Sequence, residues 1–199
     1  ANELCAKCGG IMVVVMQRVF EGDAMTWKDV AACPACGADP AEIELERRRD
    51  RERIYNTLID KAEAQAFREI RREYLPEGGA ELDRTLAAWS YDSGQGLLLI
   101  GPTGSGKTRC AWQVVRREIV EHARKVIVYS AIAFGHEATE RAYDGSTRGW
   151  IEKLARVPLF MLDDIGKEKL TEAREEALFT LIDRRAANLL PTIYTSNFE

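Results

Sequence analysis

The chain has 199 residues, of which 46% are hydrophobic and 30% charged, and its formal net charge is −4 at pH 7. This composition excludes an intrinsically disordered chain, and a mild negative charge excludes nucleic-acid binding over the whole surface, so any such contact is expected to be local. No apolar run approaches the roughly 20 residues that a membrane-spanning helix needs, and the N-terminus lacks a signal-peptide pattern. The length allows one main domain and a small appendage.

Residues 1–40 have the features of a small metal-binding module. Their four cysteines form two C-x-x-C pairs: Cys5, Cys8, Cys33 and Cys36. This is the spacing of a structural zinc site with four thiolate ligands, and a glycine follows each pair, as a tight knuckle requires. The β-rich stretches 11–20 and 27–32 between the pairs favour a zinc ribbon. Because so short a module buries little apolar surface, metal binding is expected to supply its folding free energy.

Other readings of the cysteines are less favoured. Two disulfides would need an oxidising compartment, whereas the nucleotide-binding motif described below indicates the cytoplasm. A redox-active C-x-x-C pair would need a βαβ context, which neither pair has. The contact made by the module stays open, since Phe20 and Trp27 either stack on single-stranded bases or belong to a core or protein contact.

Residues 41–75 are predicted to form a connecting amphipathic helix. The stretch Ala41–Tyr74 contains neither Gly nor Pro. Its apolar residues recur every four positions as Ile54, Leu58, Ala62, Ala66, Ile70 and Tyr74. Basic residues in Arg47–Arg53 alternate with acidic ones, which favours a solvated helix face over a nucleic-acid patch. Pro76 and the glycines after it mark a domain boundary.

The stretch GPTGSGKT, Gly101 to Thr108, fits the phosphate-binding pattern G-x-x-x-x-G-K-[ST]. An apolar run, Leu97–Ile100, precedes it and a helical pattern, Arg109–His122, follows it. Successive backbone N–H groups at a helix N-terminus cradle phosphates. Lys107 is expected to reach the β- and γ-phosphates, and the Thr108 hydroxyl to hold Mg²⁺. The predicted nucleotide-binding residues are Gly101, Pro102, Thr103, Gly104, Ser105, Gly106, Lys107 and Thr108, with Asp163 beyond them.

Two acidic residues follow a second strong strand candidate. The apolar run Leu159–Leu162 ends in Asp163 and Asp164, and doubly wound sheets deliver ligand-binding carboxylates from strand ends in this way. Asp163 is expected to hold Mg²⁺, and Asp164 to polarise the attacking water.

Later in the chain, a predicted strand 192–195 delivers Asn197, whose amide is expected to orient that water or contact the γ-phosphate, although a polar turn is the alternative. Further strand and helix patterns lie at 126–130, 131–143 and 171–188. The sequence therefore predicts an α/β fold with a parallel sheet flanked by helices over residues 76–199. Its predicted catalytic residues are Lys107, Asp164 and Asn197.

The segments GLLLIGPTGSGKT, LFMLDDIG, LFTLIDRR and PTIYTSN together resemble the AAA+ ATPases of the DnaC, DnaI and IstB group, over residues 95–199. The resemblance implies a Mg²⁺-dependent ATPase that binds ATP and ADP and associates with itself, with a replicative helicase and with single-stranded DNA. Arg109 and Cys110 stand where these loaders often carry His and Leu, which is expected to alter only packing. The family places its arginine finger, second sensor and C-terminal lid after the segment that ends at Glu199, so the resemblance assigns no residue here to them.

The leading functional hypothesis is a cytoplasmic helicase loader that hydrolyses ATP slowly unless a neighbour supplies an arginine finger. The alternatives are an IstB-like transposition regulator acting on duplex DNA, a P-loop kinase, for which no acceptor pocket is recognised, and a zinc-dependent interaction module whose ATP site only stabilises the fold. The candidate DNA contacts are Arg116, Arg117, Arg124, Lys125 and Arg148.

Overall fold

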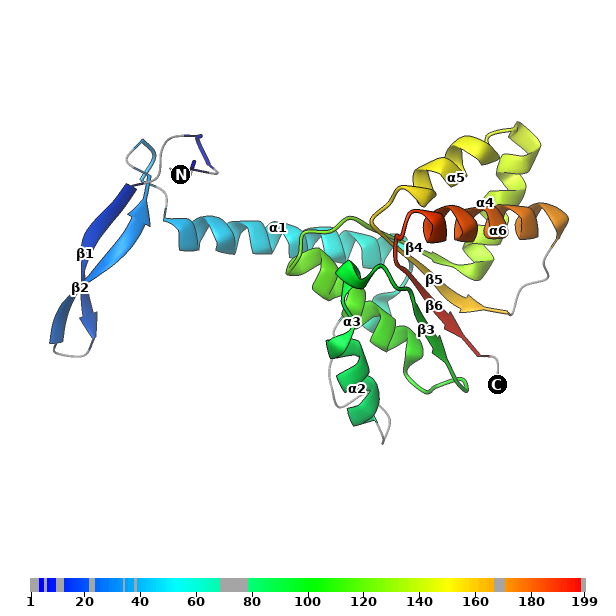
Figure 1. Cartoon of the computed structure of the whole chain (residues 1–199), viewed down its shortest axis with the longest axis horizontal. Helices are drawn as coiled ribbons and strands as arrows, with labels where there is room; N and C mark the ends of the chain where they lie inside the picture. Colours follow the sequence, from blue (N-terminus) through cyan, green and yellow to red (C-terminus); the bar gives the residue numbers. More distant parts are fainter. Residues whose placement is uncertain are drawn as a thin grey trace. The chain divides into compact units, whose positions relative to one another are not determined.

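The structure is a computed structural model of the chain. It describes residues 4–5, 7–9, 13–21, 24–33, 35–37, 39–68, 79–166 and 171–197. The chain divides into two compact units, residues 1–51 and 52–199 (Figure 1). No helix in these described ranges is long and apolar enough to cross a membrane.

The first unit is built on an antiparallel hairpin. Strand β1 (Val13–Glu21) pairs along its whole length with β2 (Ala24–Ala32), so that Val13 lies opposite Ala32 at the open end. The β2 strand begins before Trp27, where the predicted strand began. Because one cysteine pair precedes β1 and the other follows β2, the hairpin brings both pairs to the same end.

Helix α1 (Pro40–Lys61) starts where the sequence predicts but ends well before Tyr74. It ends in a left-handed turn in which Glu63 has a φ of 52° and the Ala64 N–H donates to the Ile59 carbonyl at 3.0 Å. A hydrogen bond of this kind closes a helix without a glycine. Because the segment is rich in helix-forming residues and has no glycine or proline, the sequence did not indicate where the helix ends. Residues 69–74 of the predicted helix lie outside the described residues.

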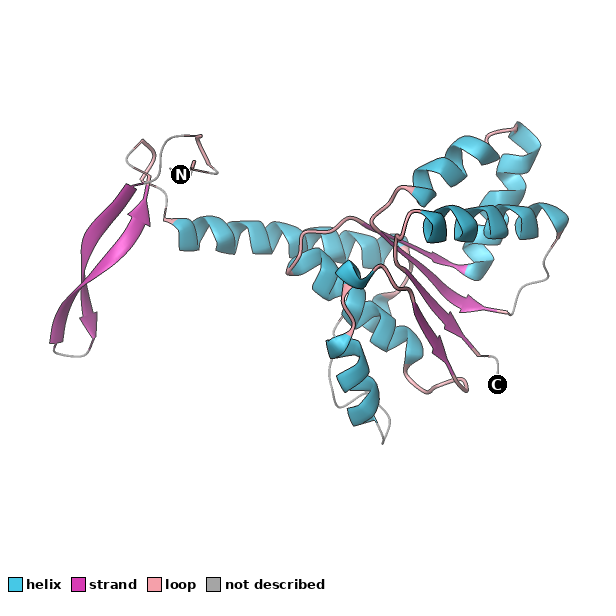
Figure 2. Cartoon of the chain, viewed as in Figure 1, coloured by secondary structure: helices cyan, strands magenta, loops and turns pink. Residues whose placement is uncertain are grey.

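The second unit contains a four-stranded parallel sheet in the order β3-β6-β5-β4. Its strands are β3 (Leu97–Ile100), β4 (Val126–Ser130), β5 (Leu159–Ile165) and β6 (Thr192–Ser196). Its helices are α2 (Gly79–Ala88), α3 (Lys107–Val120), α4 (Ala131–Asp144), α5 (Thr147–Ala155) and α6 (Glu172–Ala187), with short 3₁₀ turns η1 (Gln65–Phe67) and η3 (Tyr91–Ser93). Helices lie on both sides of the sheet (Figure 2). The predicted α/β fold class is confirmed.

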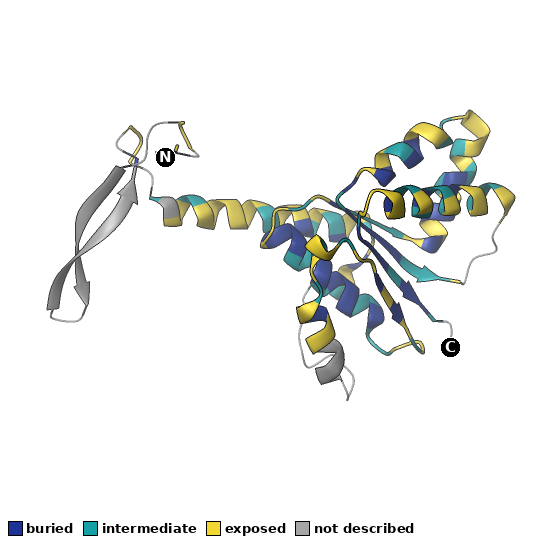
Figure 3. Cartoon of the chain, viewed as in Figure 1, coloured by how far each residue is buried: buried dark blue, intermediate teal, exposed yellow. Residues whose placement is uncertain are grey.

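The two central strands, β5 and β6, are largely buried, which suits their mostly apolar sequences, whereas the edge strand β3 exposes Leu98 and Ile100. Along β5, Leu159 and Met161 join a core with α1 and α3, whereas Phe160 and Leu162 join a second core with α4, α5 and α6. The strands are accordingly buried in their centre (Figure 3). The carboxyl ends of the strands remain accessible, and the polar residues of the site are found there.

Candidate nucleotide and metal sites

The phosphate loop connects β3 to the first turn of α3, as its motif predicts. Gly106 has a φ of 84° directly before the helix, a conformation that a side chain would strain. Lys107 is 9% exposed, and its ammonium group donates to the carbonyls of Gly101 at 2.7 Å and Pro102 at 2.8 Å and to the Ser105 hydroxyl at 3.2 Å. The loop therefore holds a positive charge at the N-terminus of a helix, where the backbone also favours anions.

The two predicted magnesium ligands lie side by side. The Thr108 hydroxyl donates to Asp163 Oδ1 at 2.9 Å, joining α3 to the end of β5. Thr195, on the neighbouring strand β6, donates to the same oxygen at 2.5 Å and accepts the Asp164 N–H at 2.8 Å. Thr195 is 1% exposed, so one buried hydroxyl fixes both acidic residues. Sequence analysis treated Thr195 only as part of a strand.

Asp164 is held in an unusual backbone conformation. Its φ is 62°, and the pairing of β5 with β6 shifts register between Leu162 and Ile165. Such a conformation costs on the order of 1–3 kcal/mol for a residue other than glycine and often occurs at functional sites. The irregularity aims the Asp164 carboxylate toward Asn197, whose side-chain amide donates to it. Ser196 restrains the strand end through a bond to the Ile165 carbonyl at 2.9 Å.

These side chains meet at one cavity of about 370 Å³. Its lining residues are Phe67, Thr103, Gly104, Gly106, Lys107, Thr108, Arg109, Asp163, Asp164 and Asn197. The structure thus gathers the three predicted catalytic residues and both predicted magnesium ligands. Gly101, Pro102 and Ser105 complete the loop through their contacts with Lys107.

Phe67 and Arg109 add a part of the cavity that the sequence did not reveal. The Arg109 guanidinium lies 5.7 Å from the centroid of the Phe67 ring and donates to the Ala66 carbonyl at 3.4 Å. The Tyr55 hydroxyl donates to the Phe67 carbonyl at 3.0 Å, which ties the turn after α1 back onto that helix. The sequence carried no signal for Phe67 because its position depends on the early end of α1.

In the first unit the four predicted zinc ligands form one cluster. The sulfur atoms of Cys5, Cys8, Cys33 and Cys36 all lie within 4.8 Å of one another. Cys5 and Cys36 are 3.7 Å apart and Cys8 and Cys33 are 3.5 Å apart, close to the separation of about 3.8 Å expected for sulfurs held tetrahedrally by Zn²⁺. A disulfide would bring two sulfurs to about 2.05 Å, so the four cysteines are thiols.

The backbone around Cys5 favours its thiolate. Hydrogen bonds from the backbone N–H groups of Cys8 and Lys7 lower the pKa of the Cys5 thiol to about 7. The Gly9 N–H donates to the Cys5 carbonyl at 2.8 Å, and the Gly37 N–H to the Cys33 carbonyl at 2.7 Å. Both knuckles thus have the same closed turn, and the cluster fits a structural zinc ion.

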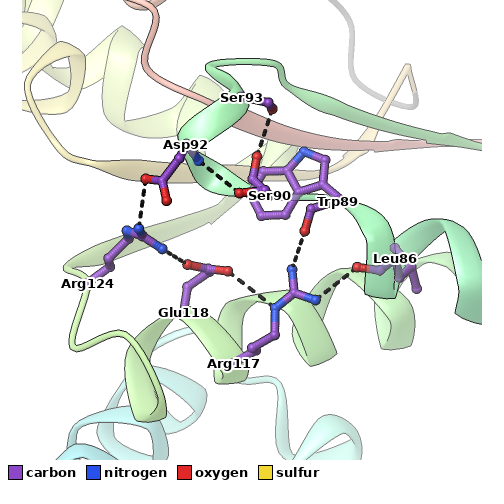
Figure 4. A network of polar contacts seen from close by, with 8 residues as sticks. All are labelled: Leu86, Trp89, Ser90, Asp92, Ser93, Arg117, Glu118 and Arg124. Carbon is purple, nitrogen blue, oxygen red and sulfur yellow. Dashed lines mark hydrogen bonds and ion pairs between the residues drawn. The ribbon is translucent and has the colours of Figure 1, made fainter.

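The predicted DNA contacts are largely engaged within the second unit. Arg116 forms an ion pair with Glu52. Arg117 and Arg124 both form ion pairs with the buried Glu118 (Figure 4), so their charges take part in internal contacts of the unit. Arg148 is exposed but lies 3.3 Å from Glu152, and Lys125 is exposed. Most of these basic residues therefore have acidic partners within the unit, and their contact with DNA stays a prediction.

A parallel sheet, a phosphate loop, two carboxylates at the end of β5 and a polar amide directly after the neighbouring strand β6 define an AAA+-like ATP-binding domain. A family model described as "IstB-like ATP binding protein" matches residues 42–199. The chain therefore belongs to the IstB-like ATP-binding protein family. No curated protein matches the sequence.

Solved structures are similar to this chain over part of its length. The DnaC helicase loader gives a TM-score of 0.58 at 20% identity, over 68% of this chain and 81% of that one. DnaI gives 0.50 at 25% identity, over 59% and 62%. Aquifex aeolicus DnaA bound to AMPPCP gives 0.53 at 19% identity, over 65% of this chain but only 43% of the DnaA chain. The likeness to DnaC and DnaA shows the shared fold.

Proposed function

We propose that the chain is a Mg²⁺-dependent ATPase. The observation that supports this is the convergence of Lys107, the Thr108–Asp163 pair and the Asp164–Asn197 pair on one cavity. Lys107 binds the β- and γ-phosphates, and Thr108 and Asp163 hold the magnesium ion, which neutralises phosphate charge. The backbone N–H groups of the loop complete the phosphate cradle.

Asp164 and Asn197 place the attacking water in this scheme. The water oxygen attacks the γ-phosphorus while the Asp164 carboxylate accepts a proton from the water, and the bond from the γ-phosphorus to the bridging oxygen breaks, so that ADP leaves. Asn197 keeps the Asp164 carboxylate in position. Hydrolysis then depends on positioning and electrostatics rather than on covalent chemistry. We further propose that an arginine from a neighbouring subunit completes the site, so the isolated chain hydrolyses ATP slowly; such a residue contributes roughly 10³- to 10⁵-fold in rate.

We also propose that the ATPase loads or remodels a replicative helicase on single-stranded DNA. The fold similarity to the DnaC helicase loader and to DnaI supports this proposal. The four-cysteine unit, residues 1–40 with bound zinc, would contact the helicase or the DNA. The family description favours a second candidate, an IstB-like regulator of transposition that acts on duplex DNA.

The catalytic proposal is tested by ATP affinity and steady-state turnover of the zinc-loaded chain. Lys107→Ala is expected to abolish ATP binding. Asp164→Asn is expected to keep binding but lower turnover by roughly 10²- to 10⁴-fold, the usual contribution of a general base. The matched control is Asp183→Asn, an exposed site on α6, which should behave as the wild type. Wild-type turnover in Asp164→Asn would contradict the assignment.

The two DNA-related functions are separated by binding assays with fluorescent single-stranded and duplex DNA, with and without a replicative helicase. ATP-dependent binding to single strands that helicase strengthens and Lys107→Ala removes supports the loader. ATP-dependent preference for duplex DNA supports the transposition regulator. If neither DNA nor helicase binds in the presence of ATP, both proposals are wrong, while the ATPase assignment stands on its own measurements.

A further inference from the structure

A groove separate from the nucleotide cavity runs beside strand β4. Within the described residues β4 pairs only with β5, so it forms one edge of the sheet. The groove has a volume of about 860 Å³. It lies between β4, the last turns of α1, the end of α3 and the start of α4, all of them in the second unit.

The β4 sequence has none of the residues that usually discourage strand pairing at an edge. Natural edge strands are blocked by prolines, charged side chains or bulges. The β4 sequence, VIVYS, contains no proline or charged residue, and its five residues pair with β5 in unbroken register. An extended chain placed in the groove would therefore find an uninterrupted row of backbone hydrogen-bonding groups.

The groove also offers apolar surface. Its lining includes Ile54, Leu58 and Ile119, and the side chain of Ile54, on α1, is 59% exposed. An isoleucine this exposed on a wall of a groove is available for contact with a ligand. Tyr129, the aromatic residue among the lining residues, contacts Phe134 and Trp150 in the core on the other face of the sheet. No lining residue is thus placed as a stacking platform for nucleic-acid bases.

The rim of the groove is positively charged. Exposed Lys61 lies at the end of α1 and exposed Lys125 directly before β4. Among the lining residues the single acidic one is Glu63, against four basic ones. Arg124 is already paired with the buried Glu118, so the excess positive charge comes from Arg53, Lys61 and Lys125.

We propose that this groove binds an extended, acidic segment of a partner protein, which pairs with β4 as a further strand. Alternate side chains of such a segment face opposite ways, so apolar residues would enter the groove while acidic residues meet Lys61 and Lys125. Backbone pairing supplies affinity and the side chains supply specificity. Single-stranded DNA would match the charge but not the apolar wall or the open strand edge.

Selection of a random displayed-peptide library on the zinc-loaded full chain tests the proposal. The enriched sequences are expected to alternate acidic with apolar residues. A synthetic peptide of the consensus is expected to protect the backbone amides of residues 126–130 from hydrogen exchange. Lys61→Glu combined with Lys125→Glu should weaken its binding roughly tenfold, because two attractions become repulsions. Ile54→Ser should weaken it further.

The matched control reverses two exposed charges on the α5 side of the unit, Lys153→Glu with Arg156→Glu, and should leave peptide affinity unchanged. All variants should keep wild-type ATP turnover and melting temperature, since the changed groups are exposed and lie outside the nucleotide cavity. The proposal is overturned by the absence of a consensus, by a neutral or basic consensus, by equal affinity in the rim variants, or by protection away from β4. If the chain binds oligothymidylate and Lys61→Glu with Lys125→Glu abolishes that binding, the occupant of the groove is nucleic acid instead. If the chain associates with itself and the same variant abolishes the association, the occupant is a second copy of the chain.

Discussion

Phe67 illustrates how a single residue extends the nucleotide site beyond the phosphate loop. Its ring lines the same cavity as Lys107 and Asp164 and lies beneath the Arg109 guanidinium. We expect the pair to hold the base of the nucleotide, since aromatic and guanidinium planes both stack on bases. Phe67→Ala should raise the Kd for ATP roughly tenfold, within the range of about 1–3 kcal/mol measured for base–aromatic stacking.

The control for this prediction is a ligand without a base. Inorganic tripolyphosphate meets only the loop and the carboxylate side of the cavity, so its affinity should be the same in Phe67→Ala and in the wild type. Phe67→Tyr keeps an aromatic plane and should retain ATP affinity. An equal loss for both ligands in Phe67→Ala, measured by calorimetry, would mean that Phe67 only supports the fold of the loop.

Some residues of the nucleotide site could be predicted from the sequence and others could not. Lys107, Asp163 and Asp164 were predictable because their motif and strand-end positions follow from local sequence. Thr195 was not, because its contacts with the Asp163 carboxylate and the Asp164 backbone N–H arise from β6 lying beside β5, a neighbour relation that chain order does not give. The positive φ of Asp164 was equally hidden, because such a conformation is usually signalled by a glycine and the sequence has an aspartate at this position.

At the scale of elements, α2 is fastened to α3 by a buried polar network. The Arg117 guanidinium donates to the carbonyls of Leu86 and Trp89, both at 2.9 Å, and thereby caps the end of α2 (Figure 4). Glu118 lies between Arg117 and Arg124, and its side chain is 2% exposed. Glu118→Gln should lower the free energy of unfolding of the second unit by about 1–3 kcal/mol, because two partly buried guanidinium groups lose the buried carboxylate that they share.

Urea unfolding followed by tryptophan fluorescence measures this effect, and Glu152→Gln is its matched control. Glu152 also contacts two arginines, Arg148 at 3.3 Å and Arg184 at 3.5 Å, but its side chain is 36% exposed. Exposed pairs contribute about 0–1 kcal/mol, so this variant should lose little. Equal losses in the two variants would show that burial does not set the strength of the Glu118 network.

Most elements of the second unit followed from apolar runs and helix patterns, and the strands at 97–100 and 126–130 agree with the structure. Three helices departed from expectation, and one of them, α2, begins at Gly79, where the sequence indicated only a domain boundary. The connecting helix ends at Lys61 because backbone bonds and the Tyr55 hydroxyl close the turn after it, without glycine or proline. Helix α5 was not predicted, since its sequence is short and begins in a glycine- and serine-rich stretch.

Arg185 joins several elements at once and also gave no signal in the sequence. It is 1% exposed, and its guanidinium donates to the Thr192 hydroxyl and to four carbonyls, those of Leu154, Val157, Pro158 and Pro191. Burial lowers the pKa of this guanidinium to about 10. Arg185 thus pairs with backbone carbonyls in the segments that lead into β5 and β6. It ties together the starts of the two strands whose other ends position Asp164 and Asn197.

At the scale of the whole molecule, the two units have different sources of stability. The second unit has two apolar cores, built from residues of the 52–199 segment. In the first unit the described core consists of Cys5 and Cys33 with Ile43 against them. A module of about 40 residues buries little apolar surface and gains little folding free energy from it, whereas zinc binding in small zinc peptides supplies roughly 10–16 kcal/mol.

Removal of zinc should therefore unfold the first unit and leave the second intact. With a strong chelator present, we expect proteases to cleave residues 1–40 rapidly, while ATP affinity and the urea transition of the second unit stay unchanged. Cys8→Ser should have the same effect without chelator, because the thiolate that it removes is one of four ligands. Cys110→Ser is the control, since Cys110 is buried in the second unit and lies outside the cluster. A hairpin that resists proteolysis without metal would show that the four thiols are not its folding core, and a fall in ATP affinity would show that the two units depend on each other.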